Sequence, residues 1–425
     1  MIERGIHAFR GQGVLLLQGP VGPFFSRLAH DLQLAGARVF KVNFNAGDRL
    51  FYRRGAFSFK GAMAEWPAWL DALLDRLDID VILLFGDCRP IHVVAHEIAM
   101  RRGLEVGVFE EGYLRPHYMT FERHGVNGHS QVPRQPSFYL AQPEAARPRR
   151  RDLGNTYWHM AWWAFLYFSI GSLGKPWFPR YAHHRRLALT EAWPWIRSGW
   201  RKLKYRALQH GMLERLCTRW DRHFFLVPLQ VFNDAQIFVH SSFDSVEAFV
   251  EEVLGSFARH APADTALVIK HHPMSRGYTD YATLVRRLAR AHGIAHRCFY
   301  VHDQHLPTLL KHARGVVVVN STTGLQALEH HVPVKALGEA IYDMPGLCHQ
   351  GPLDAFWHEA PHSGPDRVLL RRFVSFLIAR SQLNGSFYKA WPKAAAKSSN
   401  PWCATDWGEW LDRSPPGPEK GLATP

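Results

Sequence analysis

The 425-residue sequence predicts an α/β fold in which two Rossmann-like domains face each other across a cleft, with an aromatic-rich helical insertion between them. Two observations support this fold class. Short apolar runs alternate with amphipathic segments over residues 13–110, and the same alternation resumes at about residue 222. Residues 133–220 lack this alternation and are rich in aromatic and basic residues. The chain is long enough for two domains with separate cores.

The first predicted domain spans residues 1–132. Its apolar runs are the expected strands, at residues 13–19, 37–44, 80–87 and 104–113. Its amphipathic segments are the expected helices, at residues 23–36, 63–77 and 89–103. Strands that are apolar along their whole length indicate a parallel sheet that helices cover on both faces.

The predicted insertion, residues 133–220, contains the segment YWHMAWWAFLYFSIGSLG at residues 157–174. This segment is rich in Trp, Tyr and Phe, has no acidic or basic residue except His159, and lies between the basic stretches 147–151 and 175–186. Three interpretations remain open. The segment could pack its aromatic residues on a domain as a helical hairpin, lie in a membrane interface, or span a membrane, for which it is short.

The second predicted domain, residues 221–365, repeats the alternation. Its expected strands lie at residues 223–230, 265–270, 297–303, 315–321 and 332–338. Its expected helices lie at residues 245–261, 280–293, 305–314 and 322–331. Residues 366–425 are predicted to begin with a helix and to end in a loose tail rich in Trp, Pro and Ser.

Composition narrows the choice of partners. The net charge of +14 favours an anionic partner such as nucleic acid, an anionic membrane, or a phosphorylated or acidic sugar. The sequence contains no nucleic-acid-binding motif, no GxGxxG and no P-loop, so we expect neither nucleic acid nor NAD as a partner. The five cysteines are widely spaced and the N-terminus does not read as a signal peptide, which together predict a reducing cytoplasm.

Ligands of open α/β sheets bind beyond the carboxyl ends of the strands, so strand ends supply the candidate site residues. One strand of the second domain ends in KHHP, residues 270–273. Lys270 and His272 can both donate to a phosphate oxygen, and Pro273 fixes the turn. A basic turn is one alternative, and a zinc site at His271 and His272 is another. Zinc is disfavoured because adjacent side chains of an extended chain point to opposite sides.

Another strand of the second domain ends in NSTTG, residues 320–324. Asn320 or Ser321 can cap the helix that follows. The N–H groups at the start of this helix, with the hydroxyls of Ser321, Thr322 and Thr323, can bind an anion. Plain helix capping is the alternative. Together with KHHP, the stretch predicts a site for a phosphate.

Acidic residues lie at two further strand ends. FEEGY places Glu110 and Glu111 before Gly112, where either carboxylate could act as a general base or orient a sugar hydroxyl. QVFNDAQ places Gln230 and Asp234 after the first strand of the second domain, where the aspartate could be a nucleophile or hold a hydroxyl. A capping or salt-bridged role for the glutamates and an Asx turn at the aspartate are the alternatives.

Several long stretches resemble capsular polysaccharide biosynthesis proteins of the KpsS/LipB type, over roughly residues 10–390. They are QGPVGPFFSRLAHDL, FGDCRPIH, FEEGYLRP, IKHHPMSRGY, HLPTLLKHARGVVVVNSTTG and IYDMPGLCHQGPLDAFW. That family is related to β-Kdo transferases of the KpsC type and, more distantly, is similar to bacterial sialyltransferases, so the resemblance implies the GT-B glycosyltransferase fold. Two features depart from it: His331 stands where the family has a smaller residue, and residues 400–425 match nothing in it.

The resemblance implies transfer of 3-deoxy-D-manno-octulosonic acid (Kdo) from CMP-Kdo to a lysophosphatidylglycerol or phosphatidylglycerol acceptor. The product would start the β-Kdo linker of a capsular polysaccharide at the inner face of the inner membrane. Other capsule biosynthesis or export proteins are expected as further partners, and no cofactor or metal is implied. A CMP-sugar transferase of the sialyl type and a non-catalytic capsule export or scaffold protein are the alternatives.

The resemblance also implies roles for single residues. His272 and Pro273 match an HP motif and would contact the CMP phosphate, with the Ser/Thr motif at residues 321–323. Glu110, Glu111 and Gly112 match an acid-acid-Gly motif, and Asp234 would be the nucleophile of a retaining transferase.

Overall fold

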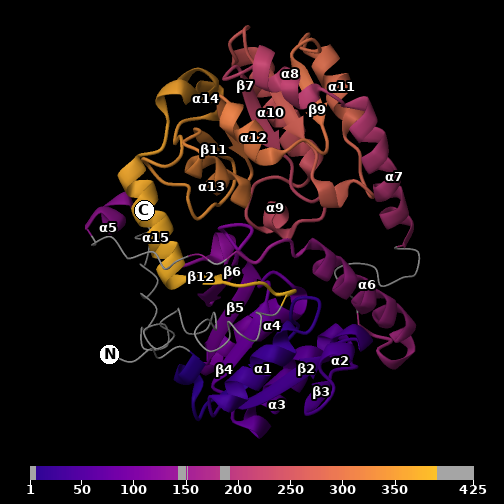
Figure 1. Cartoon of the computed structure of the whole chain (residues 1–425). Coiled ribbons are helices and arrows are strands. Elements are labelled where there is room, and N and C mark those ends of the chain that lie inside the picture. The colour runs from indigo at the N-terminus through magenta and orange to yellow at the C-terminus, as the bar shows by residue number, and fades with distance from the viewer. Residues whose placement is uncertain (1–5, 142–149, 151, 182–191, 390–425) are drawn as a thin grey trace, which may run out of the picture.

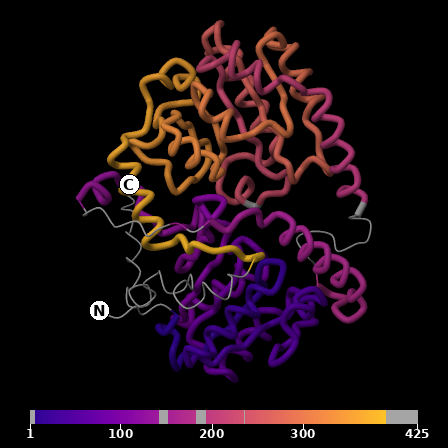
Figure 2. Tube along the Cα trace, viewed as in Figure 1, coloured from indigo at the N-terminus to yellow at the C-terminus, as the bar shows by residue number. Residues whose placement is uncertain are grey.

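The structure is a computed structural model that describes residues 6–141, 150, 152–181 and 192–389 (Figures 1 and 2). Two α/β domains lie one above the other in Figure 1, with the N-terminal domain at the bottom. Each domain holds a sheet between layers of helices. The predicted fold class is therefore confirmed, and two Rossmann-like domains facing each other are the arrangement called GT-B.

The first domain is built on a seven-stranded sheet in the order β12-β6-β5-β4-β1-β2-β3. Its strands are β1 (Gly13–Leu16), β2 (Arg38–Asn43), β3 (Ala56–Ser58), β4 (Val81–Phe85), β5 (Glu105–Glu111), β6 (Tyr118–Arg123) and β12 (Gln382–Asn384). Strands β1 to β5 are parallel, whereas β6 pairs antiparallel with both β5 and β12. Its helices are α1 (Phe24–Leu34), α2 (Ala46–Phe51), α3 (Trp66–Leu77) and α4 (Pro90–Arg102).

Strand β1 shows why the strands are apolar along their whole length. Val14 and Leu16 belong to the core on one face of the sheet, whereas Leu15 belongs to the core on the other face. All three side chains are fully buried. Because successive side chains of a strand point to opposite faces, both faces of this sheet are covered.

The second domain is built on a five-stranded parallel sheet in the order β11-β10-β7-β8-β9. Its strands are β7 (Phe224–Pro228), β8 (Ala266–Lys270), β9 (Cys298–Val301), β10 (Gly315–Val318) and β11 (Val334–Ala336). Its helices are α8 (Met212–Arg219), α9 (Ala235–Val239), α10 (Val246–His260), α11 (Ala282–Ala291), α12 (Leu306–His312), α13 (Thr322–Glu329), α14 (Leu353–Glu359) and α15 (Arg367–Arg380).

The chain returns from the second domain to the first at its C-terminal side (Figure 2). Helix α15 leads into β12, where Leu383 pairs with Met119 at the edge of the first sheet. Phe387 then packs edge to face on Phe24, in the core of the first domain. The sequence predicted the helix at the start of residues 366–425 but not this strand, and residues 390–425 lie outside the described residues.

The segment predicted as an insertion, residues 133–220, is divided between the two domains. Helix α6 (Tyr157–Leu173) packs on α2 of the first domain, where the ring of Tyr167 lies against Gly47. Helix α7 (Ala192–Leu208) is held to the second domain, because Arg197 donates to the Gly277 carbonyl oxygen. A short helix, α5 (Pro136–Ala141), packs on α15. Within the described ranges, the structure has no helix long and apolar enough to cross a membrane.

His331, where the resemblance leads us to expect a smaller residue, follows α13. Its φ of 57° lies in the left-handed region, which glycine adopts at little cost and other residues adopt rarely. The side chain is exposed. The expectation of a smaller residue at this position therefore has a physical reason in the backbone.

Candidate functional site

A residue that follows the end of β4 in the first domain meets the end of α9 in the second domain. Cys88 follows β4 of the first sheet, and its Sγ lies 3.7 Å from Nε2 of His240 in the second domain. Strand order reverses between β1 and β4 in the first sheet and between β7 and β10 in the second. Open α/β sheets bind ligands at such switch points, so both domains direct a binding position toward the same space.

At the switch point of the second sheet, Gln230 joins the ends of β7 and β10. Its Nε2 donates to Oδ1 of Asn320 over 3.1 Å and to Oδ2 of Asp234 over 3.3 Å. Asn320 in turn donates to the Gln236 carbonyl oxygen, 2.8 Å away. Gln230 and Asn320 therefore use their side chains to fix the loop that carries Asp234, which is a positioning role.

The Asp234 carboxylate is held at the start of α9. Its Oδ1 accepts from the N–H of Gln236 at 3.0 Å, so the residue caps this helix as an Asx turn would. The side chain remains partly exposed. Burial and the neighbouring Asp87 are the main causes that raise the pKa of the Cys88 thiol. The negative charges of Glu110 and Asp234 add to this shift. Carboxylates of both domains thus act on the pKa of the same thiol.

Lys270 ends β8 with its ammonium in the protein interior. The residue is only 7% exposed, and no described residue accepts a hydrogen bond from its Nζ, although this nitrogen is not one of the fully enclosed atoms that lack a partner. Burial lowers the pKa of Lys270; the charge of Asp303 opposes this shift and the charge of Arg276 adds to it. A buried ammonium without an acceptor is costly unless an anion binds to it, so Lys270 is suited to a phosphate oxygen.

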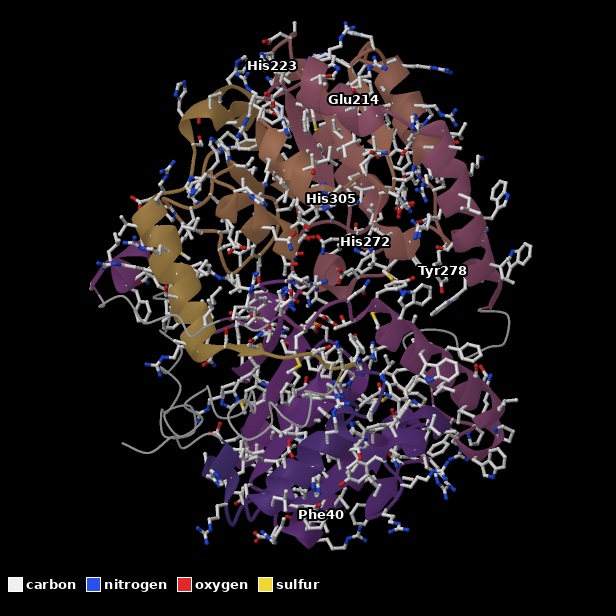
Figure 3. The ribbon with its side chains drawn as sticks, in the orientation of Figure 1. Phe40, Glu214, His223, His272, Tyr278 and His305 are labelled. Atoms are coloured by element: carbon white, nitrogen blue, oxygen red, sulfur yellow. The ribbon has the colours of Figure 1, made fainter. Side chains whose placement is uncertain are left out.

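His272, two residues after Lys270, offers a neutral donor on the side of the second domain that faces the first (Figure 3). Burial, together with the charges of Lys270, Arg115 and His271, lowers its pKa to about 3, so the ring is neutral at pH 7. Its Nδ1 accepts a hydrogen bond of 3.2 Å from the N–H of Met274, which places the ring proton on Nε2. The backbone turn that follows, which begins at Pro273, thereby orients an Nε2–H donor.

The two histidines of KHHP have different surroundings. His271 is buried, and its Nδ1 lies 2.7 Å from the hydroxyl of Tyr300 inside the second domain. His272 instead caps the short turn at Pro273–Ser275. The two rings thus have separate partners, in agreement with the argument against a zinc site there.

Ser321 begins helix α13. Its Oγ accepts from the N–H of Thr323 and lies 3.2 Å from the Oγ1 of the same residue. Ser321, Thr322 and Thr323 are all partly exposed. We use the term phosphate cluster for Lys270, His272 and these three hydroxyl residues. Capping and anion binding are compatible here, because the cap leaves the three hydroxyls reachable.

The two glutamates of the acid-acid-Gly motif differ in their surroundings. Burial raises the pKa of Glu110 to about 7, and its Oε1 accepts from the N–H of Glu111. Glu111 accepts from the hydroxyl of Tyr388, 2.7 Å away. Gly112 permits the turn after them, because a Cβ there would lie 2.0 Å from the Tyr118 carbonyl oxygen. Glu110 is therefore the carboxyl that changes protonation near neutral pH.

Sequence reasoning missed two arginines at the site. Arg89 lies at the switch point of the first sheet and donates to Oε1 of Gln18 over 2.9 Å. Arg115 is exposed and lies near enough to His272 to lower its pKa, although it belongs to the first domain. Both residues lie in motifs that carry the family resemblance, FGDCRPIH and FEEGYLRP. Their positions just after predicted strands could have identified them as candidate site residues.

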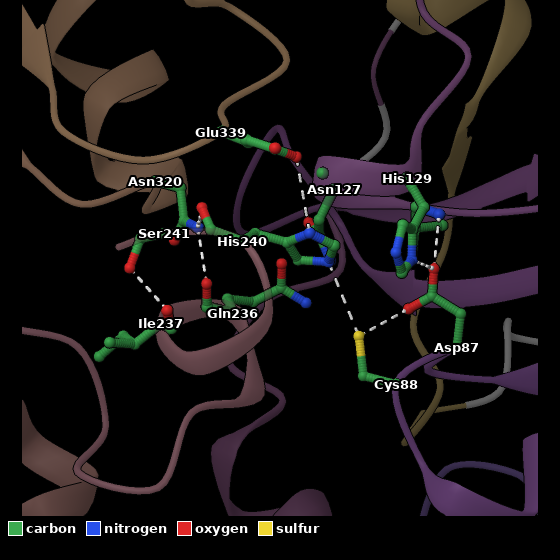
Figure 4. Close-up of polar contacts among 12 residues, drawn as sticks. Asp87, Cys88, Asn127, His129, Gln236, Ile237, His240, Ser241, Asn320 and Glu339 are labelled. Carbon is green, nitrogen blue, oxygen red and sulfur yellow. Dashed lines mark hydrogen bonds and ion pairs between the residues drawn. The ribbon is translucent and has the colours of Figure 1, made fainter. Parts of the chain in front are cut away.

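A polar cluster joins the two domains beside the site (Figure 4). Nitrogen and sulfur ligand atoms of Cys88, His129 and His240 all lie within 4.8 Å of one another, which is close enough to hold a metal ion. Asp87 binds Cys88 at 3.3 Å and His129 at 3.1 Å, and this second contact raises the pKa of His129. The cluster thus has a structural role without an ion, and the expectation of a metal-free reaction stays a prediction.

A family profile described as capsule polysaccharide biosynthesis protein matches residues 80–388. The chain belongs to this family. The match covers the switch point of the second sheet, the acid-acid-Gly motif and the phosphate cluster, and it includes β4 but not β1 of the first switch point. The resemblance drawn from the sequence motifs is thereby confirmed.

Two relatives in the capsule family extend the match to most of the chain. The capsule polysaccharide export protein KpsS of Escherichia coli is 42% identical over 380 residues, which cover 89% of this chain and 97% of the relative. The capsule polysaccharide modification protein LipB of Neisseria meningitidis serogroup B is 41% identical over 387 residues, 89% of this chain and 92% of the relative. Among solved structures, the β-Kdo 2,7-transferase KpsC of Thermosulfurimonas dismutans aligns with a TM-score of 0.41 and 15% identity, over 86% of this chain and 89% of that chain.

Proposed function

We propose that this capsule family protein is a glycosyltransferase that moves Kdo from CMP-Kdo to a phosphatidylglycerol or lysophosphatidylglycerol acceptor, which starts the β-Kdo linker. One observation carries the proposal: Lys270, a largely buried ammonium, ends β8, and His272, a neutral N–H donor, begins the turn that follows. This turn is bonded to the loop that carries Asp234, because the Ser275 hydroxyl oxygen accepts from the N–H of Phe232. This arrangement suits a donor whose leaving group is a phosphate.

The phosphate cluster would bind CMP and stabilise its departure. As the bond from Kdo to the phosphate breaks, negative charge grows on the phosphate oxygens, and fixed donors stabilise that charge more than they stabilise the ground state. Lys270 supplies a full positive charge and His272 a single N–H, while Ser321 and Thr323 lie at the N-terminus of a helix. With these groups, departure of CMP requires no metal.

The carboxylates would carry out two displacements. Asp234 attacks the anomeric carbon of Kdo, and CMP leaves with the electrons of the broken bond. The acceptor hydroxyl then attacks the glycosyl-enzyme while Glu110 accepts its proton, and Asp234 is released as a carboxylate. The scheme follows by analogy from retaining glycosidases, in which two displacements conserve the configuration. A base with a pKa of about 7 is half ionised at neutral pH, which suits Glu110 to this proton transfer.

Exposed aromatic residues on α6 and α7 would place the protein on an anionic membrane surface at the inner face of the inner membrane. We use the term aromatic surface for five residues that are each more than half exposed: Trp158, Trp162, Phe165, Trp193 and Trp200. Basic residues accompany them, and Lys204 lies over the ring of Trp200. Tryptophan beside Lys and Arg is typical of segments that lie in a membrane interface.

The test is incubation of the whole protein with CMP-Kdo and lysophosphatidylglycerol, with the product followed by mass spectrometry. The expected product is the lipid with one added Kdo. A His272→Ala variant should keep the melting temperature of the wild type and lose turnover. Full activity of this variant would remove His272 from the reaction.

The alternatives give different results in the same assay. Transfer from CMP-sialic acid but not from CMP-Kdo would replace the proposal by a sialyl-type transferase. Binding of CMP without transfer from either donor would favour a capsule export or scaffold protein with an inactive site.

A further inference from the structure

A cavity of about 960 Å³ lies between α6 and α7, where the two domains meet. Its volume is at the upper end of the range of small-molecule sites, about 300–1,000 Å³. Most of its lining is apolar: α6 contributes Met160, Ala161 and Ala164, and α7 contributes Trp195 and Gly199. A cavity with such walls favours a hydrocarbon over a sugar or a nucleotide.

The cavity reaches the proposed reaction centre. Asn233 and Pro273 both line it, and they are the direct neighbours in sequence of Asp234 and His272. Arg89, at the switch point of the first sheet, also lines it. Asp234 and His272 do not line the cavity themselves, so a molecule that fills it has one end beside the backbone segments that carry these two residues.

The helices that form the walls also carry the aromatic surface. Along α6, Ala161 and Ala164 line the cavity, whereas Trp158, Trp162 and Phe165 are exposed. An apolar chain that leaves a lipid layer under the aromatic surface can thus enter the cavity without crossing water. Lys202 of α7 and Arg89 of the first domain line the cavity, as does Arg276, which is paired with Asp303. These charges complement an anionic headgroup.

We propose that this cavity binds the single acyl chain of an anionic lipid and turns the headgroup toward Asp234 and His272. That the bound lipid is the acceptor of the reaction rests on the proposed function. Binding itself requires neither a donor nor transfer, so it can be tested separately.

Gly199 provides the variant that tests the cavity. A Cβ at this position would meet no heavy atom within 4 Å, so a large side chain can extend into the cavity without displacing the helix. Gly199→Trp should fill part of the cavity. Leu208→Trp is the matched control, because it adds the same side chain to the end of the same helix at a position that is 69% exposed and does not line the cavity.

The measurement is calorimetric titration with octyl, decyl and dodecyl phosphate below their micelle concentrations. We expect one site per chain and about fourfold tighter binding per methylene, which follows from about 0.8 kcal/mol for each buried methylene at 1.36 kcal/mol per factor of ten. Gly199→Trp should weaken dodecyl phosphate binding at least tenfold, and Leu208→Trp should leave it unchanged. Equal affinity for the three chain lengths, or equal affinity of wild type and Gly199→Trp, would overturn the inference.

Two further measurements keep the outcome decisive. If Gly199→Trp does not fold by circular dichroism, Ala164→Phe fills the cavity from α6, and unchanged dodecyl phosphate binding by that variant overturns the inference. A Trp158→Ser, Trp162→Ser double variant should lose binding to phosphatidylglycerol vesicles and keep dodecyl phosphate binding; loss of both would assign the alkyl chain to the aromatic surface instead.

The same variants separate this inference from the proposed function. Alkyl phosphate binding without any Kdo transfer would refute the transferase and leave the acyl-chain site standing. Kdo transfer to lysophosphatidylglycerol at an unchanged KM in Gly199→Trp would refute the acyl-chain site and leave the transferase standing.

Discussion

Replacing Lys270 by methionine should change ligand affinity and protein stability in opposite directions. The ammonium is largely buried and no described residue accepts a hydrogen bond from it, so in the free protein it contributes a desolvation penalty that the charge of Asp303 offsets only in part. Methionine has a similar length and no charge. Lys270→Met should therefore raise the melting temperature of the free protein while it weakens CMP binding.

The size of the binding effect follows from the contact that is lost. A hydrogen bond to a charged group contributes about 1.5–3 kcal/mol, which corresponds to about a 10- to 150-fold increase in Kd at 1.36 kcal/mol per factor of ten. Calorimetric titration with CMP measures the change. Lys335→Met is the matched control, because Lys335 is on β11 of the same domain and donates to the His349 carbonyl oxygen; its CMP affinity should stay within about twofold.

The stability effect should also depend on pH with a definite sign. The folded-state pKa of Lys270 is lowered, so the penalty is fully present below that pKa and disappears as the pH rises toward 10.5. The difference in melting temperature between Lys270→Met and the wild type should narrow over that interval. A variant that melts below the wild type at pH 7, with CMP affinity changed less than twofold, would refute the assignment of Lys270 to phosphate.

Three further predictions concern a base, a buried acid and a strained residue. Burial raises the pKa of Glu110 to about 7, so kcat/KM of the wild type should fall about tenfold for each pH unit below 7. Glu110→Gln should remove this pH dependence and lower the rate by about 100-fold or more. A variant with the pH profile of the wild type would exclude Glu110 as the base. Burial likewise raises the pKa of Glu122 from 4.5 to about 7, so the wild type loses stability as pH rises through that interval. The free energy of unfolding of Glu122→Gln in urea, taken relative to that of the wild type, should increase by up to about 3 kcal/mol from pH 4 to pH 8. The same difference between variant and wild type at both pH values would contradict this reasoning. His331→Gly should add about 0.5–1 kcal/mol by relieving the left-handed φ, measured as a higher urea midpoint; a lower midpoint would contradict this.

The sequence predicts the buried strands because their signal is local. In β1 and β4, continuous apolar residues fill both faces of the sheet, and this pattern needs no knowledge of the rest of the chain. Strand β12 carries no such signal. It has three residues, Gln382–Asn384, and it is a strand because β6, far earlier in the chain, offers an edge for pairing.

The same distinction separates the site residues. His272 could be chosen over His271 from the sequence, because the proline that follows it implies a turn, and the structure shows the ring capping that turn. Glu110 and Glu111 could not be told apart. Their difference depends on Tyr388, which bonds to Glu111 from the returning C-terminal segment. Contacts of this kind between distant parts of the chain leave no pattern in either local sequence.

The division of α6 and α7 between the domains couples the two proposed substrates. Helix α6 packs on the first domain, whereas Arg197 and Arg201 fix α7 to backbone carbonyls of the second, so the cavity between the helices changes width whenever the domains move relative to each other. CMP bound as proposed would contact the phosphate cluster of the second domain and would lie near Arg115 of the first, whose charge acts on His272, so it would favour one separation of the domains. Binding free energies are reciprocal. CMP should therefore change the affinity for dodecyl phosphate by the same factor by which dodecyl phosphate changes the affinity for CMP, and two calorimetric titrations measure both factors. A factor of one in both directions would mean that the domains keep one separation, and then the donor and acceptor sites are filled independently.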